Sequence, residues 1–152
     1  MNKDKLTAEV TQELDQLHLG AQHAAELARV PESQRRPWHA AAGAKYAADL
    51  VSGLENLCKR HYRAMNLPIP EGEDSHTCIL EAFLEEPDLG ATLSDEIKHR
   101  LKKYLRFRHR FVHGYGHEVK WEIVDEPLRL LPETVGILRE MWLRWLQGMT
   151  RT

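Results

Sequence analysis

The side chains best suited to chemistry crowd into one stretch of the sequence, residues 98–113. This stretch contains seven lysines and arginines, three histidines and no acidic residue, whereas residues 71–97 contain nine acidic residues and no lysine or arginine. Arginine binds phosphate oxygens through two parallel hydrogen bonds, and histidine accepts or donates a proton near neutral pH. The stretch therefore predicts a phosphate-binding surface. The alternative is a solvated helix face whose charges pair with the acidic residues before it.

Within this stretch, Arg108 and His113 form the most suggestive pair. Arg108 lies on the apolar stripe that also carries Ile97, Leu101 and Tyr104. A guanidinium there is costly unless it meets an anion or a partner subunit. His113 lies five residues later, about 140° further around an ideal helix. The two side chains converge only if the helix unwinds near Gly114 or if two copies meet across a two-fold axis.

Beside an RNA phosphodiester, an arginine and a histidine can assist attack of the 2′-hydroxyl on its own phosphate without a metal ion. The alternative is structural: Arg108 pairs with an acidic residue, and His113 caps the end of the helix, where a cationic imidazole is favoured. Spacing alone leaves both interpretations open.

The elements that must position this pair are helices. Apolar residues recurring every three or four positions predict helices over residues 4–29, 37–65, 75–86 and 94–113, and a last helix that begins at Pro132. Ser75 is a candidate cap of the third helix, and Thr92 or Ser94 of the fourth. Apolar and charged residues alternate over residues 119–123, which favours a loop or a short extended edge. The sequence predicts an all-α bundle of about five helices, in a single domain over residues 1–152.

Composition excludes several other classes of protein. Apolar residues make up 42% of the 152 residues, and the net charge of −2 excludes a protein that holds polyanions by bulk charge. No apolar run approaches the length of a membrane span. The N-terminus does not resemble a signal peptide. The two cysteines fit a reducing compartment, so we expect a cytoplasmic protein with no membrane partner.

No cofactor or metal is expected from the motifs. There is no glycine-rich phosphate loop and no G-x-S-x-G sequence. His109, His113 and His117 have the spacing of a zinc-binding helix face, but only Glu118 lies near as a further ligand, so a zinc site is disfavoured.

Residues outside the basic stretch have supporting roles. Glu55, near the apolar stripe of the second helix, is expected to be a buried partner for an arginine of the fourth helix. Asp74 and His76 are expected to cap the third helix, or else to orient the catalytic groups. Trp142 and Trp145 are helix-spaced and favour core or dimer packing over base stacking.

Several ordered blocks resemble one known family. Arg108-His-Arg-Phe-Val-His113-Gly-Tyr115 resembles the R-x-x-x-x-H-x-Y signature of the HepT branch of HEPN-domain toxins. Residues 46–60 resemble the second helix of HepT-like proteins. Residues 67–76 resemble their Pro-x-Gly-Glu-Asp-x-His loop, and Phe107-Arg-His109 resembles their Phe-Arg-His run. The resemblance spans roughly residues 40–125.

The resemblance implies a HEPN-type helical bundle that forms a homodimer and acts as a metal-independent endoribonuclease toxin. It also implies a partner, a nucleotidyltransferase antitoxin of the MNT type. Arg108 would bind or polarise the scissile phosphate, His113 would act as acid or base, and Tyr115 would accept AMP from the antitoxin. A bulky anion on Tyr115 would block RNA by repulsion and occlusion.

Three neighbouring residues are expected to bind RNA or support the site: Arg106, His109 and Arg110. His109 stands where the signature often has asparagine, so the proton transfer is left open between His109 and His113. The alternative function is a non-catalytic HEPN module that docks a nucleotidyltransferase or holds its substrate.

Overall fold

The computed structural model describes residues 2–113 and 119–151, without the side chains of Val112, His113 and Thr150. The described residues contain five α-helices and no strand. The helices are α1 (Lys3–Ala28), α2 (Pro37–Ala64), α3 (Ser75–Glu85), α4 (Asp95–His113) and α5 (Trp121–Arg151). Two short 3₁₀ turns, η1 (Glu32–Gln34) and η2 (Gly90–Thr92), lie in the connections. The predicted all-α bundle of five helices is confirmed.

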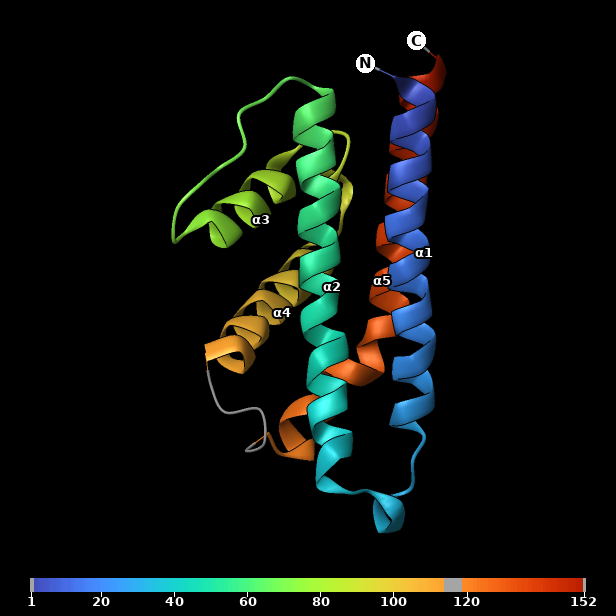
Figure 1. Ribbon diagram of the computed structural model, residues 1–152, viewed down its shortest axis with the longest axis vertical. Coiled ribbons are helices and arrows are strands. Elements are labelled where there is room, and N and C mark those ends of the chain that lie inside the picture. Colours follow the sequence, from blue (N-terminus) through green and yellow to red (C-terminus); the bar gives the residue numbers. More distant parts are fainter. Residues whose placement is uncertain (1, 114–118, 152) are drawn as a thin grey trace.

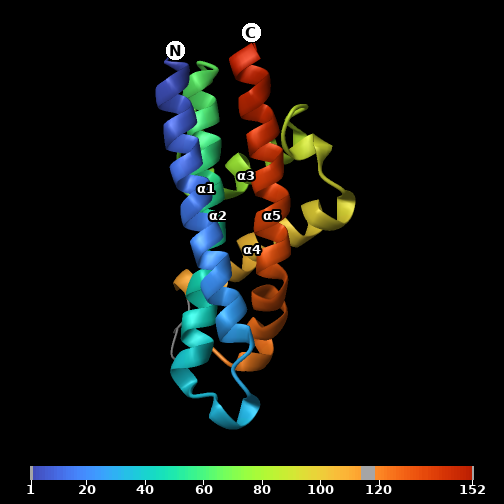
Figure 2. The ribbon, with the colours of Figure 1, turned by 90° about the vertical axis from the view of Figure 1, so that its right-hand side faces the viewer.

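Helix α2 is the central element of the bundle. It contacts α1 and α5 on one flank and α3 and α4 on another. Figure 1 shows the two groups on opposite sides of α2, and Figure 2 shows α1, α2 and α5 aligned along the long axis. The core lies where the apolar stripes of these helices meet; on α1, that stripe is Leu6, Val10, Leu14, Leu17, Ala21 and Ala24.

Small residues let the neighbouring helices approach α2 closely. A Cβ atom built at Gly53 would lie 2.5 Å from Leu17 of α1, and one built at Gly43 would lie 2.5 Å from Val124 of α5. Ala44 and Ala47 are fully buried on the same helix. The alanine-rich first half of α2 therefore packs as its composition predicts, with no room for larger side chains at the contacts.

The helix ends follow the predicted capping signals in α4 and depart from them in α3. Ser94 Oγ accepts a hydrogen bond from the Ile97 N–H at 3.2 Å, which caps α4. Helix α3 begins at Ser75, so its N-cap residue is Asp74, whose side chain makes no capping bond. The expected cap at Ser75 was wrong by one residue.

The start of α5 also differs from the prediction. Helix α5 begins at Trp121, so residues 121–123 are helical, and both Pro127 and Pro132 lie inside it. Each proline removes a backbone N–H and interrupts the helix ladder. The Tyr104 hydroxyl donates a hydrogen bond to the Pro127 carbonyl at 2.5 Å, and the first turns of α5 are bent relative to the rest (Figure 1). The Arg35 guanidinium lies over Trp121, the first residue of α5, at 4.2 Å from the centre of its ring.

Two tryptophans complete the core near the C-terminus. Trp142 is fully buried and Trp145 nearly so, and their rings meet edge to face at 5.4 Å. The core role predicted for both is confirmed. Among the described residues, no helix combines the length and the apolar character that a membrane crossing requires.

Candidate functional site

Arg108 lies where the apolar stripe of α4 faces α2. Leu101 and Tyr104, on the same stripe, are buried, and Arg108 is partly buried. Its Nε donates a hydrogen bond to Ser52 Oγ of α2 at 3.3 Å. Ser52 in turn donates to the Ala48 carbonyl at 3.4 Å. No carboxylate in the described part of the chain forms an ion pair with Arg108, so the acidic partner of the structural alternative is not found there.

This contact gives the guanidinium a defined orientation. Hydrogen bonding through Nε leaves the two terminal nitrogens as the edge that binds a phosphate bidentately. A serine in the middle of an alanine-rich helix carries no sequence signal for such a role, so sequence reasoning missed Ser52.

Helix α4 is continuous through His113, so residues 108 and 113 stand about 140° apart around one helix. Of the two predicted routes to convergence, the meeting of two copies across a two-fold axis is the one that remains. The side chain of His113 lies outside the described residues, as do all of Tyr115 and His117. The convergence of Arg108 with His113 and the role of Tyr115 accordingly stay predictions.

The basic residues that are expected to support the site lie on the outside of α4. Arg106, His109 and Arg110 are exposed. Arg106 and Arg110, together with Lys103, line a groove of about 320 Å³ between α4 and the first turns of α5. The walls of that groove include Phe107 and Ile123. Cationic side chains around a partly apolar groove are suited to binding a nucleic acid strand.

The acidic stretch before α4 neutralises little of this charge. Arg100 forms two ion pairs: its Nη2 lies 3.2 Å from Glu96 Oε1, and its Nη1 lies 3.2 Å from Glu133 Oε1. Lys103, Arg106 and Arg110 form no ion pair with a described residue. The positive surface therefore remains available to a polyanion.

Glu55 has a different partner from the one expected. Its side chain is buried, and its Oε1 lies 2.6 Å from Nδ1 of His76, the second residue of α3. The predicted pairing with an arginine of the fourth helix was therefore wrong. A buried carboxylate requires a hydrogen-bonded partner, and the first turn of α3 supplies it. His76 is thus bound to α2.

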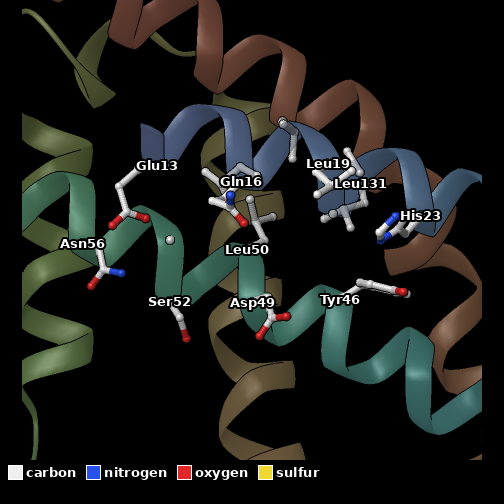
Figure 3. Close-up of a pocket in the computed structure, with 15 residues that line it drawn as sticks. Glu13, Gln16, Leu19, His23, Tyr46, Asp49, Leu50, Ser52, Asn56 and Leu131 are labelled. Atoms are coloured by element: carbon white, nitrogen blue, oxygen red, sulfur yellow. The ribbon is translucent and has the colours of Figure 1, made fainter. Parts of the chain in front are cut away.

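Another groove, of about 340 Å³, runs between α1 and α2 (Figure 3). Its polar lining includes Glu13, Gln16 and Asp49, and no lysine or arginine among the described residues lines it. This lining is unsuited to a phosphate chain. In Figure 3 the side chains of Asp49 and Ser52 point away from α1 at the edge of this groove, and Ser52 Oγ also binds Arg108 of α4.

The buried titratable groups lie in the core. Burial raises the pKa of the Cys58 thiol far above its ordinary value, and it raises the pKa of Tyr104 to about 12. Burial lowers the pKa of His61, although Glu86 and Asp88 oppose the shift. These groups keep their neutral forms at neutral pH and do not serve as nucleophiles. No cluster of three or more potential metal ligands occurs in the described part of the chain.

The comparisons with known proteins agree with the helical architecture. Residues 42–149 match the family model described as HepT-like protein, which covers well over half of the 152-residue chain. Searches among curated proteins and among solved structures give no match. The match includes most of α2 and all of α3 and α4, the elements that carry Ser52, His76 and Arg108. The chain therefore belongs to the HepT-like family.

Proposed function

We propose that this HepT-like protein is a metal-independent endoribonuclease toxin of a HEPN/MNT toxin–antitoxin system, acting in the cytoplasm as a homodimer. The observation that carries the proposal is the Arg108 guanidinium, held by Ser52 at the cationic end of α4 and unpaired with any described carboxylate. A charge placed on an apolar stripe without an acidic partner is suited to an incoming phosphate.

In this mechanism Arg108 binds the scissile phosphate through its terminal nitrogens. The 2′-hydroxyl of the neighbouring ribose attacks phosphorus as the bond to the 5′-oxygen breaks, which leaves a 2′,3′-cyclic phosphate. His113 transfers a proton in this step. Arg106 and Arg110 bind phosphates along the strand, and their exposed positions on α4 support that role.

Regulation follows from the family resemblance. An MNT-type nucleotidyltransferase antitoxin transfers AMP from ATP to the Tyr115 hydroxyl, releasing pyrophosphate. The added phosphate and adenosine occupy the approach to Arg108, and the new negative charge repels RNA.

The proposal is tested with purified protein and a labelled RNA. Wild-type protein is expected to cut RNA in the presence of EDTA and to leave 2′,3′-cyclic phosphate ends, whereas Arg108→Ala and His113→Ala are expected to abolish cutting and growth arrest without loss of the fold. Exposed His18 on α1 supplies the control, because His18→Ala is expected to cut like wild type. A wild-type protein that cuts no RNA, or that EDTA inactivates, would overturn the proposal.

The alternative is a non-catalytic HEPN module that docks a nucleotidyltransferase or holds its substrate. The groove lined by Lys103, Arg106 and Arg110 favours this candidate, since a cationic surface binds without catalysing. It predicts retained partner binding in Arg108→Ala and no cleavage by the wild type.

A further inference from the structure

A carboxylate–imidazole pair lies on the flank of α2 that also binds Arg108, and the mechanism above leaves it unused. Glu55 Oε1 lies 2.6 Å from His76 Nδ1. The Glu55 side chain is 9% exposed, whereas that of His76 is 45% exposed. The carboxylate is thus enclosed by the protein, while the imidazole reaches the surface.

The hydrogen bond fixes the chemistry of the ring. An ionised carboxylate has no proton to give, so Nδ1 of His76 carries the hydrogen in this bond. In the neutral ring, Nε2 then has a lone pair and accepts a proton. The buried Glu55 charge stabilises the imidazolium that forms, and it holds the ring in one orientation.

Helix α2 places this pair next to Arg108. Ser52, which binds Arg108, and Glu55, which binds His76, are three residues apart on α2. Side chains at this spacing leave the same face of a helix, with their Cβ atoms about 5–6 Å apart. Helices α3 and α4 contact α2 and each other, and Figure 1 shows both on one flank of α2. Two different helices therefore bring a guanidinium and an imidazole over neighbouring positions.

We infer that His76 is the general base of the ribonuclease site, and this inference rests on the proposed function. His76 Nε2 takes the proton of the 2′-hydroxyl, and the 2′-oxygen forms a bond to phosphorus. The bond between phosphorus and the 5′-oxygen breaks, and His113 gives a proton to that oxygen. Glu55 and Ser52 are positioning residues.

The deciding variant is His76→Asn. Asparagine places an amide N–H near the position of Nδ1 and keeps the bond to Glu55, but it has no group at the position of Nε2. Single-turnover cleavage is expected to fall by roughly 10²–10⁴-fold, the usual range for a lost general base. The affinity for RNA methylated at every 2′-oxygen, which is not cleaved, and the melting temperature are expected to match wild type. His18→Asn on exposed α1 is the matched control and is expected to cleave at the wild-type rate.

A second substrate identifies which proton His76 moves. A substrate with sulfur in place of the bridging 5′-oxygen has a leaving group that needs no proton. It is expected to restore cleavage by His113→Asn and not by His76→Asn. In Glu55→Gln, kcat is expected to fall with KM unchanged, because the ring loses its fixed orientation and the stabilising charge.

The outcomes separate this inference from the proposed function. If Arg108→Ala is inactive while His76→Asn cleaves within about threefold of wild type, the inference is wrong and the proposed function stands. Restoration of His76→Asn by the sulfur substrate also overturns the inference, because it makes His76 the proton donor. A wild-type protein that cuts no RNA removes the proposed function and the inference together.

Discussion

Replacing Arg108 with lysine keeps the positive charge and removes the planar guanidinium. Lysine has no counterpart of Nε, so the bond to Ser52 Oγ is lost; at 3.3 Å that bond is long and contributes about 0.5–1 kcal/mol. Lysine also binds phosphate with one hydrogen bond in place of two, which removes a charge-assisted bond of about 1.5–3 kcal/mol. The lost phosphate bond, about 1.5–3 kcal/mol of transition-state stabilisation, lowers the cleavage rate by roughly 10- to 160-fold, whereas the lost Ser52 bond lowers the stability of the fold.

The assay is single-turnover cleavage of a labelled RNA at saturating protein, with thermal melting of the same samples. The unfolding free energy of Arg108→Lys is expected to fall by less than about 1 kcal/mol, because the lost bond is long and its donor only partly buried. Arg144→Lys is the matched control, since Arg144 is exposed on α5, away from α4. It is expected to cleave at the wild-type rate.

Two results would refute this reasoning. If Arg108→Lys cleaves within threefold of wild type, phosphate is not bound by the guanidinium edge. If the variant instead loses more than about 2 kcal/mol of stability along with its activity, Arg108 is mainly a structural contact between α4 and α2.

Three further predictions concern stability. Tyr104→Phe is expected to lower the unfolding free energy by about 1 kcal/mol, because the Pro127 carbonyl loses its donor; chemical denaturation measures this, and an unchanged value would contradict the role given to that bond. Gly90→Ala is expected to lower the unfolding free energy by about 1–3 kcal/mol, since its Cβ would overlap the backbone of α3. Gly20→Ala is expected to raise the unfolding free energy by about 0.5–1 kcal/mol, because nothing lies within 4 Å of its Cβ. Equal melting temperatures of the two variants would contradict this reasoning. Burial lowers the pKa of His61 in the folded protein. Below the ordinary histidine pKa of about 6.5, the unfolded chain therefore binds a proton that the folded chain does not, which favours unfolding. The melting temperature of the wild type is expected to fall between pH 7 and 5 by more than that of His61→Phe.

Periodicity was sufficient to predict the helices whose packing is regular. The stripe of Leu6, Val10 and Leu14 identifies α1, and the Ser94 cap with acidic residues after it identifies the start of α4. These signals are local, so they can be read from the sequence without knowledge of the neighbouring elements.

The start of α5 could not be predicted, because its determinants are distant in sequence. From local sequence alone, Pro127 and Pro132 predict the end of a helix. In the structure, the Tyr104 hydroxyl donates a hydrogen bond to the Pro127 carbonyl near the bend, and the Arg35 guanidinium lies over the Trp121 ring. Both partners come from other elements, and sequence spacing does not reveal them.

For the candidate site, the sequence located Arg108 on a stripe that faces the bundle, and the structure shows it there. It did not identify Ser52, and it assigned Glu55 to the wrong partner. Both errors arise because a buried polar side chain selects its partner by three-dimensional proximity. The pairing of Glu55 with His76 depends on how the chain returns after α2, which local spacing does not specify.

The attachment of α3 has a consequence for inhibition. This helix has only 11 residues, and the Glu55–His76 bond joins its first turn to α2. If His76 is the proposed base, a ligand that displaced α3 would remove the imidazole while Arg108 stayed bound to Ser52, and RNA would be expected to bind without being cut. Faster amide hydrogen exchange in α3 would mark this inactive state. Because the Phe83 ring of α3 stacks on Trp142 of α5 at 5.9 Å, exchange around Trp142 would also become faster.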